Sequence, residues 1–193
     1  MDPSTFASAY GLSTSVGIRP FLTLALASLA MHFGYLHPAH AYAFLGTDGA
    51  TWLLAGLAVL EFAADKIPIL DHALHVLHFA AKPVAAALLV GSVSGAPPDA
   101  GVDVMMGLGA LNALGVHTAV AATRGASTAM TLGTANPFLS LGEDIAAVFS
   151  AVLAILVPFA GAMLAAAITL VLFVVARRLY LEIRRSRSSP TAA

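Results

Sequence analysis

Long apolar runs separated by short polar joins are the feature of this sequence that most restricts its fold. The run from Phe159 to Val175, for example, contains no charged residue. A helix needs about 20 mainly apolar residues to cross the hydrocarbon core of a bilayer, because each residue adds about 1.5 Å. Only 10% of the residues are charged, against about 25% in a soluble domain. We therefore expect an all-α polytopic membrane protein whose main partner is the lipid bilayer.

Six apolar segments are candidate membrane spans. They cover residues 10–35, 51–64, 69–93, 102–122, 138–157 and 159–175. The second segment is short, so we expect it to be tilted, broken or extended by its flanks. Pro158 separates the last two segments, which requires a tight connection. The prediction is a single membrane domain over residues 1–193 that ends in a polar cytoplasmic tail over residues 181–193.

The basic residues indicate an orientation. With six spans and both termini in the cytoplasm, all Lys and Arg residues outside the spans fall in cytoplasmic segments, while the outer loops contain Asp48, Asp99 and Asp103. This split is what the positive-inside rule demands. A cleaved secretory signal is the alternative for the N-terminus, since AHA at 39–41 imitates a cleavage site. A signal begins with a short basic segment, however, and the first basic residue here is Arg19.

Composition and missing motifs exclude several function classes. The net charge is −1, so no nucleic-acid partner is expected, and without cysteine there is neither a disulfide framework nor a thiolate metal site. The sequence contains no phosphate-cradling glycine loop, no GxSxG and no HExxH. We therefore predict neither an enzyme nor a bound cofactor.

The stretch SGAPPDAG divides the spans into three plus three, with halves at 10–94 and 101–180. Halves with an odd number of spans enter the membrane from opposite sides, so related halves would form an inverted repeat with broken helices. Each half offers a glycine near a basic residue and then an acid in the following span. These residues are Gly17, Arg19 and Glu61 in the first half and Gly115, His117, Glu143 and Asp144 in the second. Chance matches in such an Ala-, Gly- and Leu-rich sequence are the alternative.

The third segment carries a polar stripe. Asp71, His75, His78 and Lys82 follow the spacing i, i+4, i+7 and i+11, which places them within roughly 60° on one helix face. A charge facing lipid costs a few kcal/mol at least. We expect the stripe to face inward and to line a path for an ion or small polar solute, with a proton relay through histidine as one form. The alternative is an interfacial cap by Asp71 and His75, with Lys82 snorkelling to the headgroups.

Metal binding is a second interpretation of the same stripe. Asp71, His75 and His78 offer nitrogen and oxygen ligands that suit zinc or a similar ion. A metal-dependent membrane enzyme is therefore a further hypothesis. The outer histidines His37 and His40 are expected to be surface residues.

Acidic residues near the second span need basic partners at the same depth in the membrane. Glu61 and Asp65 lie four residues apart on one helix face, and Glu61 is the deeper of the two. We expect Arg19 to pair with Glu61, either as a structural salt bridge or as part of a binding site. Pro20 removes a backbone donor beside Arg19 and is expected to bend the first span.

The counterpart in the second half is ANPFLSLGEDIAA. Ser140 and Glu143 have the spacing of a capping box, which predicts a helix that begins at Ser140. Asp144 then needs its own partner, for which His117 and Arg124 are the candidates. The functional alternative makes Glu143 or Asp144 the counterpart of Glu61.

The stretch LLAGLAVLEFAADKIPILD, with GIRPFL before it and GVHTAVAATR and LSLGEDIAA after it, resembles a family of small bacterial membrane proteins. This family is catalogued as domain of unknown function 4126, and the resemblance extends from Gly11 to Val175. It implies a helical protein of the bacterial inner membrane with no assigned activity and no assigned residue roles. The motif residues correspond to Gly17, Arg19, Glu61, Asp65, Lys66, Pro68, Asp71, Gly115, His117, Glu143 and Asp144.

Together these features predict a small secondary transporter or channel for an ion or small polar solute. The candidate binding residues are Arg19, Glu61, Asp65, Asp71, His75, His78, Lys82, His117, Glu143 and Asp144. The alternative is a membrane scaffold or assembly protein whose charges pair internally. Small residues such as Gly107, Gly109 and Ala113 allow helices to approach closely, within the chain or in a homodimer.

Overall fold

The computed structural model describes residues 2–64, 68–95 and 100–188, and within them all side chains except those of 68–76, 176, 179, 180 and 182–188. The described part of the chain is helical and contains no strand, which confirms the all-α prediction. Its elements, in chain order, are α1 (Pro3–Ile18), α2 (Pro20–His32), the 3-10 helix η1 (His40–Gly46), α3 (Asp48–Ala64), α4 (Pro68–Val93), α5 (Ala100–Thr131), α6 (Asn136–Leu156) and α7 (Pro158–Ser188).

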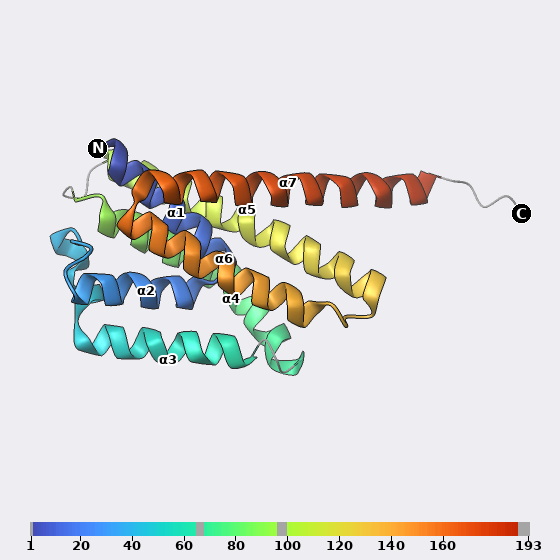
Figure 1. The fold of residues 1–193 in the computed structure, drawn as a ribbon, viewed down its shortest axis with the longest axis horizontal. Helices are drawn as coiled ribbons and strands as arrows, with labels where there is room; N and C mark the ends of the chain where they lie inside the picture. The colour runs from blue at the N-terminus through green and yellow to red at the C-terminus, as the bar shows by residue number, and fades with distance from the viewer. Residues whose placement is uncertain (1, 65–67, 96–99, 189–193) are drawn as a thin grey trace, which may run out of the picture.

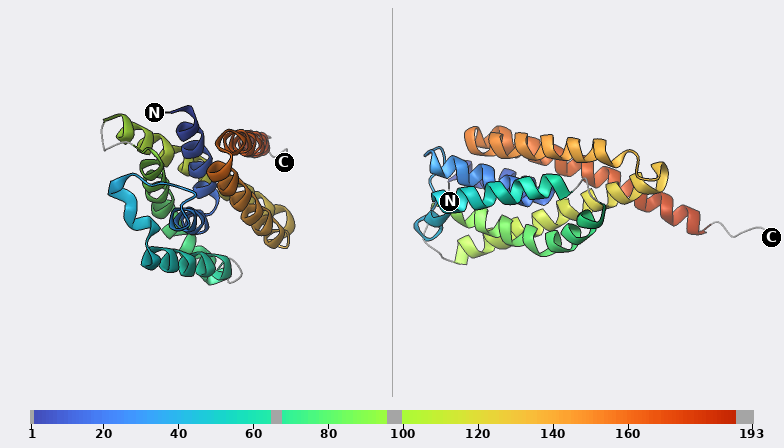
Figure 2. Two further views of the ribbon diagram at one scale, coloured as in Figure 1. Left: turned by 60° about the vertical axis from the view of Figure 1, so that its left-hand side comes forward. Right: turned by 90° about the horizontal axis from the view of Figure 1, so that it is seen from below.

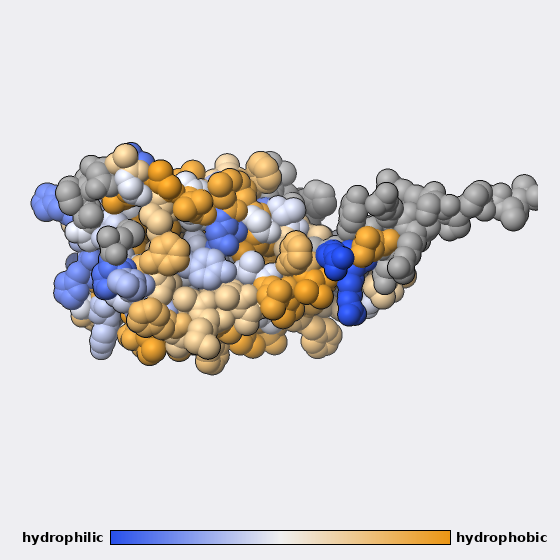
Figure 3. Space-filling view, turned by 90° about the horizontal axis from the view of Figure 1, so that it is seen from above, coloured by the Kyte–Doolittle hydropathy of each residue, from blue (hydrophilic) through white to orange (hydrophobic). Residues whose placement is uncertain are grey.

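Among the residues that the structure describes, three helices are long and apolar enough to cross a bilayer: α5, α6 and the part of α7 up to Val175. The pair η1 and α3, bent by 61° at their junction, adds a fourth if it counts as one span. The six predicted spans are therefore not confirmed in the described residues. Large apolar side chains such as Trp52, Phe138 and Met163 are strongly exposed, as lipid contact requires. On the face in Figure 3, most of the strongly hydrophilic residues lie near the ends of the bundle.

The first predicted span is a hairpin of two helices. α1 ends at Ile18 and α2 begins at Pro20, with Arg19 between them in an extended conformation (φ −133°, ψ 95°). Proline suits the first position of a helix, and the residue before a proline avoids the helical region. Figure 1 shows α2 running back beside α1, so that the tip at Arg19 lies midway along the bundle. The bend expected at Pro20 is thus a full reversal.

This hairpin changes the predicted topology. Because α2 returns to the end at which α1 starts, the beginning of α1 and the end of α7 lie at opposite ends of the bundle (Figures 1 and 2). The structure therefore does not support two termini on one side of the membrane. The first half contains the broken hairpin, whereas the second half contains three continuous helices, so the inverted repeat gains no support either.

α1 is the central helix, and its residues from Ala7 to Ile18 are buried apart from Tyr10. Its polar side chains bind neighbouring backbone: Ser8 Oγ donates to the carbonyl of Ala154 (2.8 Å) and Ser15 Oγ to that of Ala147 (2.8 Å). These two bonds show that α1 runs antiparallel to α6. This arrangement brings the hairpin tip to the first turns of α6, where two of the predicted acidic residues lie.

Candidate functional site

Ionisable side chains surround the tip of the α1–α2 hairpin, and they come from α3, α4, α5 and α6 as well as from the tip itself. Those that are at most 6% exposed are Arg19, Glu61, His78, Lys82 and His117. Charged residues are almost never buried to this degree unless they are paired. The prediction that the ionisable groups face inward is confirmed for these side chains. We call this group, together with Arg124, Glu143 and Asp144, the polar cluster.

Arg19 binds α6. Its Nε lies 2.7 Å from Oδ1 of Asp144, and its Nη2 donates to Oγ of Ser140 at 2.8 Å. Glu143 is slightly farther from the same guanidinium, at 3.7 Å. The predicted pairing of Arg19 with Glu61 is wrong, because the antiparallel packing of α1 on α6 places Ser140 and Asp144, one helical turn apart, beside the hairpin tip.

Glu61 instead binds the start of α2 and a histidine of α4. Its Oε2 accepts the backbone N–H of Leu22 at 3.1 Å, and its Oε1 lies 3.1 Å from Nε2 of His78. The N–H of Leu22 belongs to the first turn of α2, where backbone donors have no partner within the helix. A carboxylate at this position also interacts favourably with the helix dipole. Glu61 therefore caps α2 from a different helix.

Arg124 and Glu143 form a bidentate ion pair between α5 and α6. Nε of Arg124 donates to Oε1 of Glu143 at 3.0 Å and to Oε2 at 3.2 Å, and its Nη2 also donates to Oε2. The predicted capping box is wrong, because α6 begins at Asn136 and Ser140 therefore lies inside the helix. Asp144 pairs with Arg19, a partner that the sequence did not predict for it.

Lys82 contacts a base and not an acid. Its Nζ lies 2.9 Å from Nδ1 of His117, and both side chains are buried. Within the described part of the chain no carboxylate oxygen lies within 4.0 Å of Nζ, although Glu61, Glu143 and both arginines of the polar cluster are close enough to influence it electrostatically. Lys82 points into the bundle, so the snorkelling alternative is wrong.

Several predicted site residues cannot be placed. Asp65 and Lys66 lie outside the described residues, as do the side chains of Asp71 and His75. The stripe on α4 is therefore seen only through His78 and Lys82, which both face inward. No group of three metal-binding side chains occurs among the described residues, and His78 faces Glu61. The outer histidines His37 and His40 are exposed, as expected of surface residues.

Hydroxyl groups that the sequence did not single out stabilise the hairpin tip. Thr23 Oγ1 donates to the carbonyl of Arg19 at 2.7 Å and lies 2.7 Å from Oγ of Ser15 on the other arm. Ser15 and Thr23 each lie four residues from Arg19 in the sequence, and this placement was the signal that could have predicted the bonds. Such bonds satisfy polar groups that the break would otherwise leave unpaired in an apolar interior.

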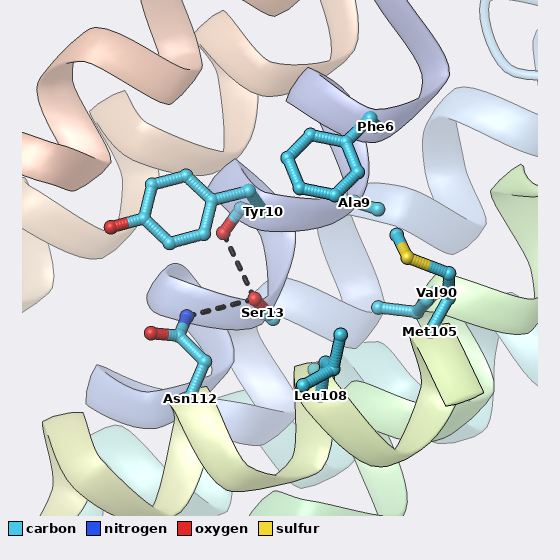
Figure 4. A pocket seen from close by; sticks show the side chains of 9 residues that line it. Phe6, Ala9, Tyr10, Ser13, Val90, Met105, Leu108 and Asn112 are labelled. Atoms are coloured by element: carbon cyan, nitrogen blue, oxygen red, sulfur yellow. Dashed lines mark hydrogen bonds between the residues drawn. The ribbon is translucent and has the colours of Figure 1, made fainter. Parts of the chain in front are cut away.

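A separate apolar pocket lies between α1, α4 and α5, toward the end of the bundle where α1 starts (Figure 4). Phe6, Val90, Met105 and Leu108 line it, and its volume of about 60 Å³ has room for a few waters only. Asn112 closes its polar side by donating to Ser13 at 2.9 Å. Ser13 precedes Arg19 by about 9 Å along the helix. The pocket is thus distinct from the polar cluster.

Apolar helices around a buried group of charges at a broken helix indicate an integral membrane protein with a polar site inside its helical bundle. The chain belongs to the family described as domain of unknown function 4126, whose family model matches residues 6–178. The resemblance seen at the LEFAADKIP motif is therefore confirmed. Comparison with curated proteins and with solved structures finds no match.

Proposed function

We propose that the protein is a small secondary transporter or channel that moves an ion or small polar solute across the bacterial inner membrane. The observation that carries this proposal is the polar cluster, which gathers around the tip of a broken helical hairpin midway along an apolar bundle. Ionisable residues at bilayer depth are costly and typically mark a path for ions or solutes. Discontinuous helices at the midplane form the binding sites of many secondary transporters.

Energetics favour a functional role for these charges. Replacing a buried ion pair by apolar residues of similar volume is often neutral or stabilising, by about 1–4 kcal/mol. A bundle that needed only stability would therefore gain nothing from charges at the hairpin tip. Substrate contact gives these side chains a role that apolar residues cannot fill.

The charges at the ends of the bundle suggest an orientation. Arg177 and Arg178 lie on the part of α7 that extends beyond the apolar bundle, whereas the exposed Asp48 and Asp103 begin α3 and α5 at the opposite end (Figure 1). The positive-inside rule then places the end of α7 in the cytoplasm and the start of α1 on the outer side. The N-terminal arm of the hairpin would enter the membrane from outside.

A scaffold or assembly protein is the second candidate function. Three described carboxylates each have a basic partner: Asp144 has Arg19, Glu143 has Arg124, and Glu61 has His78. Such pairing would suffice to hold helices in a fixed arrangement without binding a solute.

Flux measurements on purified protein in liposomes separate the two candidates. A pH-sensitive dye inside the vesicles reports proton movement. Capacitive currents report charge movement after the concentration of sodium chloride, sodium phosphate, sodium acetate or ammonium chloride is raised suddenly. We expect a signal from the wild type that falls at least tenfold in Glu61→Gln and Lys82→Met. Arg178→Gln, which changes an exposed charge on α7, is the matched control and should keep wild-type flux. Undiminished flux in both cluster variants, or no flux in the wild type with any probe, would contradict transport.

A further inference from the structure

We propose that the buried ammonium group of Lys82 binds a small anion. The solute that the polar cluster accepts is then an oxyanion such as a carboxylate or phosphate. This inference rests on the proposed transport function and names its substrate. It starts from the pairing within the cluster, where Lys82 is the one described cation without a carboxylate within 4.0 Å.

Lys82 has unused hydrogen-bonding capacity. A lysine ammonium carries three N–H donors, and the contact with Nδ1 of His117 uses one of them. The described residues offer no acceptor to the other two. The side chain is only 3% exposed, so the bulk solvent does not replace these partners. An isolated buried charge costs several kcal/mol, which a counter-ion would offset.

The neighbouring acids are already engaged. Asp144 faces Arg19 at 2.7 Å, and Glu143 holds Arg124 in a bidentate pair. Glu61 accepts the N–H of Leu22 and contacts His78. A carboxylate that moved to Lys82 would therefore leave another buried donor without its acceptor. The counter-ion of Lys82 is more readily supplied from outside the chain.

The surroundings of Lys82 suit an anion. The ring of Phe21, at the start of α2, lies 6.0 Å from that of His78, one helical turn before Lys82 on α4. The positive end of the α2 dipole thus adjoins this part of α4 and favours negative charge nearby. The guanidinium groups of Arg19 and Arg124 contribute positive potential at Lys82, which opposes the negative potential of Glu61 and Glu143. Carboxylate or phosphate oxygens would accept the two remaining ammonium donors in charge-assisted hydrogen bonds.

The chain offers a direct test because it contains only two lysines, Lys66 and Lys82. Protein labelled with 13C at the lysine ε-carbon and placed in phosphatidylcholine nanodiscs gives two NMR signals, and the Lys66→Arg variant identifies that of Lys82. Titration with sodium acetate or sodium phosphate should shift the Lys82 signal saturably, and a shift with sodium chloride alone would contradict an oxyanion site. The Lys66 signal reports the non-specific effect of salt.

A second arm identifies the source of the anion. Nanodiscs that contain phosphatidylglycerol, without added salt, supply an anionic lipid headgroup, and a shift of the Lys82 signal only in these nanodiscs assigns the site to a lipid. A shift with soluble anions assigns it to a free solute, and both results support an anion site. An unchanged Lys82 signal in every arm would overturn the inference. Flux that persists without any such shift would refute the anion but leave the transport proposal intact.

Discussion

Arg19 at the hairpin tip and Asp144 on α6 lie 2.7 Å apart, and this pair links the broken first helix to the second half of the chain. The guanidinium is almost fully buried, and it also contacts Ser140 and Glu143 of α6. The position of the reversal in the bundle is therefore determined by contacts between distant segments. Several measurable consequences follow from this pairing and from its neighbours.

A double-mutant cycle distinguishes Asp144 from Glu61 as the partner of Arg19. Arg19→Gln leaves a carboxylate without its cation, so we expect a loss of about 3 kcal/mol in the free energy of unfolding in detergent. Adding Asp144→Asn should recover part of that loss, which gives a coupling energy of about 1 kcal/mol or more. The cycle of Arg19→Gln with Glu61→Gln serves as the control and should show a smaller coupling. Stronger coupling to Glu61 would contradict the described arrangement.

The cap that Glu61 provides for α2 predicts a graded response. Glu61→Gln keeps an oxygen that accepts the N–H of Leu22, whereas Glu61→Ala removes it. Loss of a cap costs about 1 kcal/mol, so the alanine variant should be less stable by about that amount. Hydrogen exchange of the Leu22 amide should accelerate in Glu61→Ala and change much less in Glu61→Gln. Equal exchange in both variants would argue against the cap.

Gly17 is expected to be essential for the position of the hairpin tip, whereas Gly115 is not. A Cβ on Gly17 would lie 2.6 Å from Cβ of Val116 and 2.8 Å from the carbonyl oxygen of Ala113, so Gly17→Ala must push α1 away from α5. We expect destabilisation of about 1–3 kcal/mol, measured by unfolding in detergent. Gly115→Ala is the matched control, because no atom lies within 4 Å of its added Cβ. Equal stability of the two variants would contradict the close crossing of α1 and α5.

The helical class and most helix positions could be predicted from the sequence. The segments 138–157 and 159–175 correspond closely to α6 and to the start of α7, and Pro158 begins α7 as the tight connection requires. Apolar run length and proline positions are local properties, which explains this success. The reversal at Arg19 is different, because the run 10–35 is mainly apolar and resembles one bent span. The bonds that hold the reversal, such as that between Ser15 and Thr23, form only in the folded hairpin.

The site was predicted as a set of residues but not as a set of pairs. Burial of Glu61, His78 and Lys82 followed from the cost of exposing charge to lipid. The partner of each group depends on which helices are neighbours and in which direction they run. The expected Arg19–Glu61 pair assumed that equal depth implies contact, whereas the antiparallel packing of α1 on α6 gives Asp144 that place.

Accessibility of the polar cluster to water-soluble reagents tests the central claim most directly. The chain has no cysteine, so single-cysteine variants on α6 can be compared without background. Ser140 accepts a hydrogen bond from Arg19 of the polar cluster, Ala151 is in the fully buried core, and Phe149 is 60% exposed on the apolar surface. We predict that a membrane-impermeant methanethiosulfonate reagent labels Ser140→Cys in proteoliposomes at least tenfold faster than either control. Labelling of Ser140→Cys as slow as that of both controls would show that the charges do not surround a space that solutes can reach.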